Sequence, residues 1–482
     1  MNKRMIAYLL GRMLTVEAVL MAPSAVLAAV YGEGDLRAFL VTMALLVLLG
    51  VPLSLRRPAN VAIFAREGFV TVALAWVLMS AFGALPMVLS GAIPSYVDAL
   101  FEMVSGFTTT GASILKEVES LPRGVLFWRS FSHWVGGMGV LVFVMAILPM
   151  SENRSMVLMR AEVPGPTASK LVPRMRDTAK ILYGTYSVMT LALIVLLLLG
   201  GMPWFDAVCH AMGTAGTGGF SVRNAGIAYY NSPYIEVVLS IFMLLFAINF
   251  NLYYLILIRR VREALKSEEL HWFLGIVAGA VLIVTACVLP LYSGLGESLR
   301  HALFQVSSII STTGFATVDF ALWPVLAQEV LLVLMFVGAC AGSTGGGFKA
   351  SRVALSCKSL AAELHHLLHP RAVTAVRLDG KAVDHATITG TRNYLIGCVL
   401  ILTAVTLLIA VDGFDFTTNF SAAMSCFNNI GPGLSVVGPM SNYSAYSPFS
   451  KLLLSLAMLA GRLEVFPIVL LFSPRTWRRS AS

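Results

Sequence analysis

The chain has 482 residues, of which 57% are hydrophobic and 12% are charged, and its mean hydropathy is +0.81. Because a soluble domain carries about 25% charged residues, this composition excludes an ordinary soluble protein and indicates an integral membrane protein. The formal net charge of +9 does not indicate a nucleic-acid-binding protein, since the basic residues do not gather into one binding face.

Ten apolar runs of about 20 residues could each cross the hydrocarbon core of a bilayer. In chain order they cover residues 7–30, 39–55, 69–90, 125–148, 181–200, 235–258, 273–291, 325–348, 394–411 and 452–472. If Met1 lies inside, 25 of the 34 Lys and Arg residues fall on the inner side and seven fall on the outer side. The positive-inside rule therefore predicts a multi-pass protein in contact with lipid, with both termini in the cytoplasm.

The beginning of the chain allows two interpretations. A basic pair at 3–4, an apolar run and small residues at 25–29 resemble a cleavable signal peptide. Arg12 and Glu17 interrupt the apolar run, however, and a basic start equally orients a helix that is retained. We expect a retained first helix, which pairs with the second run in an N-terminal hairpin at 1–67.

From residue 68 onward, one pattern occurs four times: an apolar run, a short amphipathic phrase that ends in Gly, and a second apolar run. The phrases cover 99–111, 207–219, 302–314 and 419–431. Because each unit has two apolar runs, all four enter the membrane in the same orientation and can surround one axis. We therefore predict an all-α integral membrane protein in which the hairpin precedes four parallel helix–pore loop–helix repeats around a pseudo-fourfold pore, at 68–177, 178–268, 269–388 and 389–482.

Each phrase predicts a re-entrant helix of about two to three turns and an extended segment that returns outward, because irregular backbone at membrane depth must be buried in protein or line an aqueous cavity. The C-terminal end of a helix favours a cation, and rings of backbone carbonyls can replace the hydration shell of an ion. We therefore expect a cation filter formed by Thr109, Thr110, Gly111, Thr217, Gly218, Gly219, Thr312, Thr313, Gly314, Asn429, Ile430 and Gly431.

A surface loop is the alternative for any single phrase, since Gly, Ser and Asn are common in loops. This alternative is strongest for the fourth phrase, which lacks Thr before its Gly. Four phrases in one frame, each between two apolar runs, favour the filter.

The eighth apolar run contains a Gly-rich stretch that predicts a broken helix, because Gly is a poor helix former. The stretch does not match a phosphate-binding loop, since Phe348 separates the last Gly from Lys349. A flexible segment beneath the filter suits a gate, and a packing kink is the alternative. The predicted gate residues are Gly342, Ser343, Thr344, Gly345, Gly346, Gly347 and, from the last apolar run, Arg462.

Arg462 lies near the middle of the last run, where an ionisable side chain is costly and usually faces the interior of a bundle or an aqueous path. It would place a positive charge below the filter, as a barrier to cations. The alternative is a structural ion pair with Glu464.

No other cluster of residues predicts chemistry. The six cysteines have no paired spacing and predict neither disulfides nor a metal site. His365 and His369 are one helical turn apart, but no carboxylate or Cys completes a metal site there. No arrangement of nucleophile and base stands out, so we expect no enzyme activity, no cofactor in this chain and no metal site outside the filter.

Several phrases together resemble the Trk/Ktr/HKT superfamily of potassium-uptake proteins. They are GFTTTGAS at 106–113, WRSFSHWVGGMG at 128–139, GGFS at 218–221, STTGFAT at 311–317, GSTGGGFK at 342–349, NIGPG at 429–433 and GRLE at 461–464. The resemblance covers essentially the whole chain. The extra N-terminal hairpin is similar to that of the pore-forming subunit of the bacterial Trk type.

This resemblance implies a gated, K⁺-selective pore in the bacterial inner membrane, with one pore in each subunit of a homodimer and K⁺ bound at the filter residues. It also implies a cytoplasmic, TrkA-like regulatory subunit that binds nucleotides such as NAD or ATP. Because this chain has no Rossmann fingerprint, that nucleotide site would lie on a separate polypeptide. Gly111 ends the first phrase at the position where a Ser would indicate the sodium-permeable branch, so the resemblance favours K⁺.

An H⁺- or Na⁺-coupled potassium symporter is the alternative function. A coupled carrier should bury carboxylates near the bilayer midplane as a relay, and apart from Glu464 the apolar runs hold few candidates. A membrane scaffold or receptor would have no use for four filter phrases.

Overall fold

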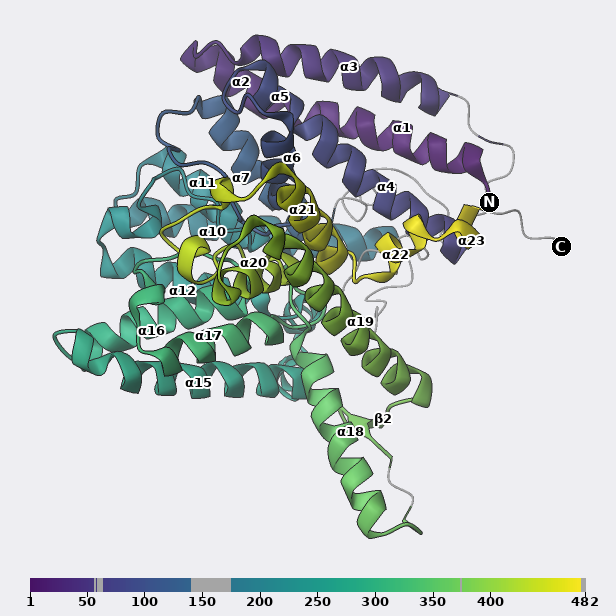
Figure 1. Cartoon of the computed structure of the whole chain (residues 1–482), viewed down its shortest axis with the longest axis vertical. Helices are drawn as coiled ribbons and strands as arrows, with labels where there is room; N and C mark the ends of the chain where they lie inside the picture. Colours follow the sequence, from purple (N-terminus) through teal and green to yellow (C-terminus); the bar gives the residue numbers. More distant parts are fainter. Residues whose placement is uncertain (56–57, 59–63, 140–174, 373–374, 478–482) are drawn as a thin grey trace.

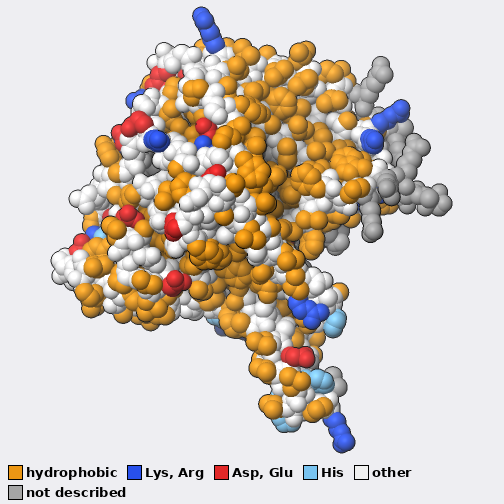
Figure 2. Space-filling view, viewed as in Figure 1, with side chains coloured by type: hydrophobic (Ala, Val, Ile, Leu, Met, Phe, Trp, Pro, Cys, Tyr) orange, Lys and Arg blue, Asp and Glu red, His pale blue; other side chains and the backbone are white. Residues whose placement is uncertain are grey.

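The computed structural model describes residues 1–55, 58, 64–139, 175–372 and 375–477 (Figure 1). Helices make up almost all of the regular structure in these ranges, which confirms the predicted all-α fold. Two short strands, β1 (Arg377–Leu378) and β2 (Lys381–Ala382), pair antiparallel. Hydrophobic side chains cover much of the face seen in Figure 2, as expected for a surface that contacts lipid.

The first helices of the chain form a hairpin. Helices α1 (Lys3–Leu20) and α2 (Ala22–Tyr31) make one apolar stretch, and α3 (Leu36–Leu55) returns along α1 (Figure 1). The two backbones meet at a pair of glycines: a Cβ on Gly11 would lie 2.8 Å from the carbonyl oxygen of Gly50, and a Cβ on Gly50 would lie 2.7 Å from that of Gly11. Small residues at such crossings let membrane helices approach closely.

Four short helices occupy the positions of the predicted phrases, each between two apolar helices. The short helices are α6 (Tyr96–Phe107), α11 (Trp204–Gly216), α16 (Leu295–Ile310) and α20 (Phe416–Asn428). The helices that precede them are α4 (Ala65–Gly83), α10 (Met175–Leu199), α15 (Glu268–Val288) and α19 (His385–Ile409). The helices that follow are α7 (Arg123–Gly137), α12 (Pro233–Ala247), α17 (Val325–Val337) and α21 (Pro448–Arg462). This order is consistent with four repeats.

Side-chain caps fix where two of the short helices, α6 and α20, begin. The Ser95 side chain accepts a hydrogen bond from the Asp98 amide, and the Asp415 side chain accepts one from the Thr418 amide. Asp206 lies in the first turn of α11. Such groups satisfy the unpaired amides of a helix N-terminus and complement its dipole, so the opposite, electronegative ends of these helices are directed into the protein.

The remaining elements are short, apart from α18. They are α5 (Leu85–Leu89), η1 (Gly226–Tyr230), α13 (Phe250–Leu257), α14 (Val261–Leu265), η2 (Leu289–Leu291), η3 (Phe320–Leu322), α18 (Ala350–Leu368), η4 (Ala410–Asp412), η5 (Ser435–Val437), η6 (Tyr443–Ala445), α22 (Phe466–Phe472) and α23 (Pro474–Trp477). Helix α18 projects away from the helical body (Figure 1).

The predicted spans at 235–258 and 452–472 are broken rather than continuous, whereas the broken helix predicted for the run at 325–348 is present. Among the described residues, six helices are long and apolar enough to cross a membrane, or seven if α12 and α13 count as one bent span. That pair bends by 91°. Helix α17 ends at Val337, and α21 ends at Arg462 before α22 begins at Phe466. The third repeat is therefore not alone in having a broken second helix.

Apolar composition could not reveal the breaks in the second and fourth outgoing helices, because each of these runs remains hydrophobic on both sides of the break. In the last run, Glu464 and Val465 have positive φ values of 55° and 66°, which a right-handed helix cannot contain, so the helix ends before them. For the predicted span 125–148, α7 ends at Gly137 and residues 140–148 lie outside the described residues, as does most of the connector at 151–180.

The first and last described segments meet at the start of α4. The amino group of Met1 lies 3.8 Å from the Glu67 carboxylate, and Arg66 Nε donates a 2.7 Å hydrogen bond to the Thr476 carbonyl. Residues 1 and 476 therefore lie on the same side of the protein.

The glycine contact in the hairpin generates a prediction. Gly11→Ala places a Cβ inside the backbone of α3, so we expect a loss of about 1–3 kcal/mol of stability and a lower melting temperature of the purified protein in detergent. Gly275→Ala is the matched control, because a Cβ at this position of α15 would have nothing within 4 Å. Equal melting temperatures for the two variants would contradict the close crossing.

Candidate ion filter and gate

The segments that follow the four short helices share one backbone conformation. The first residue of each segment adopts left-handed φ values of 56°, 57°, 61° and 58°, in Thr109, Thr217, Thr312 and Asn429. The amide of the next residue then donates back to a carbonyl five residues earlier, at 2.8–3.0 Å: Thr110 to Ser105, Gly218 to Gly213, Thr313 to Ser308 and Ile430 to Ser425. Such a conformation costs a non-Gly residue about 1–2 kcal/mol, so its fourfold occurrence shows that the surroundings impose it.

A glycine with positive φ ends each segment and touches the next segment in turn. A Cβ on Gly111 would meet the carbonyl oxygen of Gly218, and one on Gly219 would meet that of Thr313. A Cβ on Gly314 would meet the oxygen of Ile430, and one on Gly431 would meet that of Thr110. All four separations are below 3.0 Å. The structure therefore brings all twelve predicted filter residues into one closed ring of four segments.

A pocket of about 120 Å³ opens at this ring. Its lining includes all four terminal glycines, Gly111, Gly219, Gly314 and Gly431, together with residues that follow them in the chain. The fourth segment is part of the ring although it lacks Thr, because Asn429 Nδ2 donates to Thr110 Oγ1 at 3.0 Å and to the Met458 carbonyl at 2.9 Å. Its amide thus links the fourth segment to the first.

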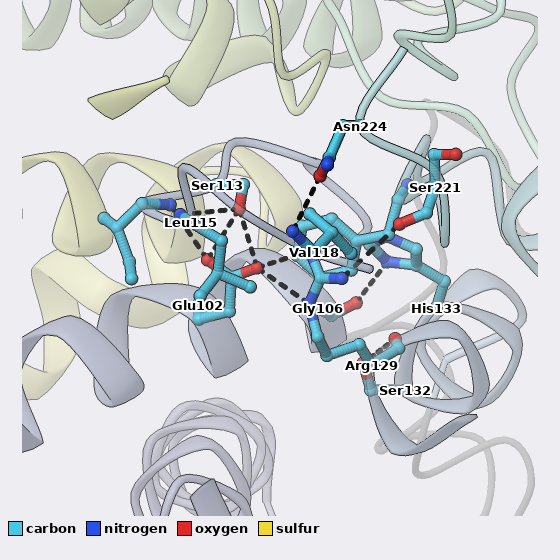
Figure 3. Close-up of polar contacts among 12 residues, drawn as sticks. Glu102, Gly106, Ser113, Leu115, Val118, Arg129, Ser132, His133, Ser221 and Asn224 are labelled. Atoms are coloured by element: carbon cyan, nitrogen blue, oxygen red, sulfur yellow. Dashed lines mark hydrogen bonds and ion pairs between the residues drawn. The ribbon is translucent and has the colours of Figure 1, made fainter. Parts of the chain in front are cut away.

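A buried ion pair behind the first two segments escaped sequence analysis (Figure 3). Arg129 of α7 donates to Glu102 of α6 at 2.6 and 2.9 Å, and both side chains are buried. Glu102 also accepts hydrogen bonds from the Ser113 hydroxyl and the Ile114 amide, which follow the first filter segment. The Arg129 guanidinium lies 4.2 Å from the centre of the Phe220 ring, which follows the second. The pair therefore holds both segments in place.

His133 makes a second connection between the same segments (Figure 3). Its Nδ1 lies 2.7 Å from the Gly106 carbonyl oxygen, and its Nε2 lies 3.3 Å from the Phe220 amide nitrogen. A carbonyl accepts and an amide donates, so the two contacts fit a neutral imidazole protonated at Nδ1. A Cβ on Gly218 would collide with this ring. Ionisable residues in apolar runs were the signal that could have identified both Arg129 and His133.

Arg462 contacts two different parts of the protein. Its Nη2 donates to the carbonyl oxygens of Gly136 and Gly137 at 2.6 and 2.7 Å, at the C-terminal end of α7. Its Nη1 donates to the Thr344 carbonyl at 2.8 Å, in the predicted gate. A cation is favoured at a helix C-terminus, and here the same guanidinium also holds the Gly-rich loop.

The Gly-rich loop at 338–349 packs against the ends of α16 and α20. The Gly346 amide donates to Thr312 Oγ1 at 2.6 Å, so the loop touches a filter residue directly. A Cβ on Gly345 would lie 2.7 Å from the Ser311 carbonyl oxygen, and one on Gly346 would overlap that of Asn428. The loop therefore needs glycine where it crosses these helix ends, and the predicted gate residues and the filter form one site.

Polar contacts fix the rest of the loop. The Lys349 ammonium donates to the Gly345 carbonyl, and Thr344 Oγ1 donates to the Phe246 carbonyl at 3.1 Å. Glu464 forms an ion pair with Arg352 of α18, with Oε2 2.6 Å from Nη2. Arg352 is thus an ion-pair partner of Glu464 that the sequence did not indicate.

The cysteines and the His365–His369 pair, which were weighed as possible sites from the sequence, have the following arrangement in the described residues. The six cysteines, all among the described residues, form no disulfide. Within the part of the chain that the structure describes, no group of three His, Cys, Asp or Glu residues is placed to hold a metal ion. The rings of His365 and His369 stack on each other 4.8 Å apart.

Comparison with known proteins identifies relatives along the whole chain. Residues 36–479 match the TrkH family, described as a cation transport protein. The chain is 36% identical over 485 residues to the Trk system potassium uptake protein TrkH of Halomonas elongata, covering 99% of this chain and 100% of that protein. It is 34% identical over 481 residues to the Trk system potassium uptake protein TrkG of Escherichia coli, with 98% and 99% covered.

A solved structure agrees with this result. The crystal structure of the potassium transporter TrkH from Vibrio parahaemolyticus superposes with a TM-score of 0.89 at 33% sequence identity, covering 99% of this chain and 100% of that chain. The resemblance drawn from the sequence phrases is thereby confirmed. The chain belongs to the TrkH family of cation transport proteins, which are transporters and not enzymes.

Proposed function

We propose that this chain is the pore-forming subunit of a Trk-type system and takes up K⁺ across the bacterial inner membrane through a gated, channel-like pore. The observation that carries the proposal is the closed ring, in which each terminal glycine lies against a carbonyl of the next segment. Potassium uptake is the function named for relatives that match over the full chain.

The ring suits a dehydrated monovalent cation. Four helix C-termini converge on it, and the partial negative charge of those ends favours a cation. Its polar atoms are backbone carbonyls and hydroxyls rather than carboxylates, which suits the replacement of a hydration shell without trapping the ion. K⁺ is the transported ion in this proposal and binds at the twelve filter residues.

We propose that the Gly-rich loop is the gate of this pore and that its contacts with the ends of α16 and α20 keep the pore closed. The loop covers the ends of α16 and α20 and hydrogen-bonds to Thr312, while Arg462 adds a positive charge beside it. Opening requires the loop to leave these contacts. The alternative of a packing kink would leave the ion path unaffected by changes in the loop.

A coupled symporter is less well supported by the contacts. Glu102, a buried carboxylate next to the filter, is committed to Arg129 and to the segment after α6. Its geometry is that of a structural support rather than a proton or sodium relay.

The proposed assembly follows the family. We place both termini and α18 in the cytoplasm, with the four repeats at 68–177, 178–268, 269–388 and 389–482, and we propose a homodimer in lipid that a separate, TrkA-like nucleotide-binding subunit regulates. The relatives' names describe a Trk system, which supports the presence of further components.

Single-channel recording tests the transport mechanism. Purified protein in planar bilayers should give discrete K⁺ currents that exceed the turnover of any carrier, and a cytosolic fraction containing the regulatory subunit should change the open probability. Slow, saturable flux that requires a proton or sodium gradient would instead establish a symporter.

Gly314→Ala tests the ring. The new Cβ would overlap the Ile430 carbonyl, so we expect K⁺ uptake into proteoliposomes to fall by about tenfold or more, with normal insertion into the membrane. Gly279→Ala is the control, because a Cβ there would have nothing within 4 Å. Unchanged K⁺ flux and K⁺/Na⁺ selectivity in the filter variant would refute the filter role.

Arg462→Ala tests the gate. Removing the guanidinium releases the Thr344 carbonyl and a buried positive charge, so basal K⁺ flux should rise by about tenfold. Arg260→Ala is the matched control, because this exposed arginine pairs only with Glu263 on its own surface helix among the contacts described. If flux falls in the Arg462 variant while assembly is intact, the loop is a packing element and not a gate.

A further inference from the structure

The first turn of α15 carries two carboxylates with different partners. Glu269 is buried, and its Oε1 accepts hydrogen bonds from the Ala341 amide at 2.6 Å and from the Ser351 amide at 3.2 Å. Ala341 directly precedes Gly342, and Ser351 lies in the first turn of α18, just after the loop. One carboxylate oxygen therefore holds both ends of the Gly-rich loop.

Glu268 connects the same helix end to the projecting part of the protein. Its Oε2 lies 2.5 Å from Lys358 Nζ of α18 and accepts a hydrogen bond from the Asp379 amide at 3.2 Å. The Glu268 amide donates in return to Asp379 Oδ1 at 2.7 Å. Asp379 lies in the turn between β1 and β2. Helix α18 and the β1–β2 hairpin are thus both bound to Glu268 of α15. The neighbouring residue, Glu269, makes the contacts with the Gly-rich loop.

The loop depends on such outside contacts to keep its conformation. Gly342 and Gly347 have φ of 70° and 80°, and Lys349, which is not a glycine, has φ of 86°. Glycine adopts positive φ readily, but at Lys349 such a backbone persists only where its surroundings fix it. A buried carboxylate that accepts two amide hydrogen bonds is a strong restraint, since charge-assisted hydrogen bonds are about twice as strong as neutral ones.

The two carboxylates differ in how easily their contacts break. The Glu268–Lys358 pair is partly exposed, with about a third of each side chain accessible, and exposed ion pairs contribute little. The Glu269 contacts are buried, and losing them leaves two amides unsatisfied away from water. A displacement of α18 relative to α15 would therefore break the outer pair first and strain the Glu269 contacts next.

We propose that Glu269 is a positioning residue that clamps the gate loop closed, and that Glu268 passes movement of α18 and of the β1–β2 hairpin to this clamp. The inference rests on the proposed gate role of residues 342–347. It assigns a mechanical connection between the projecting segment, where a regulatory partner can act, and the loop next to the filter.

Basal flux of rubidium or potassium into proteoliposomes, without any cytosolic fraction, tests the clamp. Glu269→Ala should raise this flux by about tenfold, and Glu269→Gln, which keeps an oxygen that accepts hydrogen bonds, should restore part of the closed state. Glu263→Ala is the control, because Glu263 is an exposed acid that pairs with Arg260 in the same part of the chain. Wild-type flux in Glu269→Ala would overturn the clamp.

Charge exchange tests the connection through Glu268 without disturbing a buried group. Glu268→Lys and Lys358→Glu should each raise basal flux, and the double variant should return it toward the wild-type value, because the ion pair forms again with its charges exchanged. A merely structural ion pair would lower the flux of the single variants through loss of folded protein, rather than raise it. Equal flux in the single and double variants would overturn the connection.

Failure of this inference can be told apart from failure of the proposed gate. If deleting residues 342–347 raises flux but Glu269→Ala does not, the gate stands and the clamp is wrong. If the deletion lowers flux in an intact assembly, the gate assignment itself is wrong. The proposal that Glu269 clamps the gate is then wrong as well.

Discussion

The contact between a terminal glycine and the carbonyl of the next segment is the constraint on which the rest of the structure depends. It occurs four times: three of the contacts join parts of the chain about a hundred residues apart, such as Gly111 and Gly218, and the fourth joins Gly431 back to Thr110. This contact can form only if all four short helices end at the same place. Each helix must also be followed by a residue with positive φ, which turns the chain into the ring. The four helix C-termini are held together at the ring by the polar side chains behind it and by the breaks in the outgoing helices.

The supports behind the ring differ between its two halves. Segments one and two are held by side chains that are fully partnered, the Glu102–Arg129 ion pair and His133. Segments three and four instead contact the Gly-rich loop, which donates a backbone amide to Thr312. Where no water is present, each unsatisfied polar group costs several kcal/mol, so withdrawing the loop requires new partners for the groups that it leaves. The Gly-rich loop therefore supports segments three and four, whereas side chains of α6 and α7 support segments one and two.

The sequence predicted the fold class, the four phrases and the close association of filter and loop, because these features depend on local signals: apolar length, a repeated frame and glycines. It predicted the break in the third outgoing helix but not those in the second and fourth, since residues such as Val465 look helical by composition and leave the helix only because of their place in the packed structure. Nor could it pair Glu464 with Arg352, or join Glu269 to Ala341, because partners 72 to 112 residues apart are set by tertiary packing.

The contact between Gly431 and the Thr110 carbonyl is less close than the other three contacts of the ring. A Cβ on Gly431 would lie 2.7 Å from the Thr110 oxygen, the largest of the four separations, and its φ of 106° differs from the values of 78–81° at the other three glycines. The fourth segment is also the one that replaced Thr with Asn and Ile. A side chain at Gly431 would therefore press less closely on the neighbouring segment than one at any of the other three glycines.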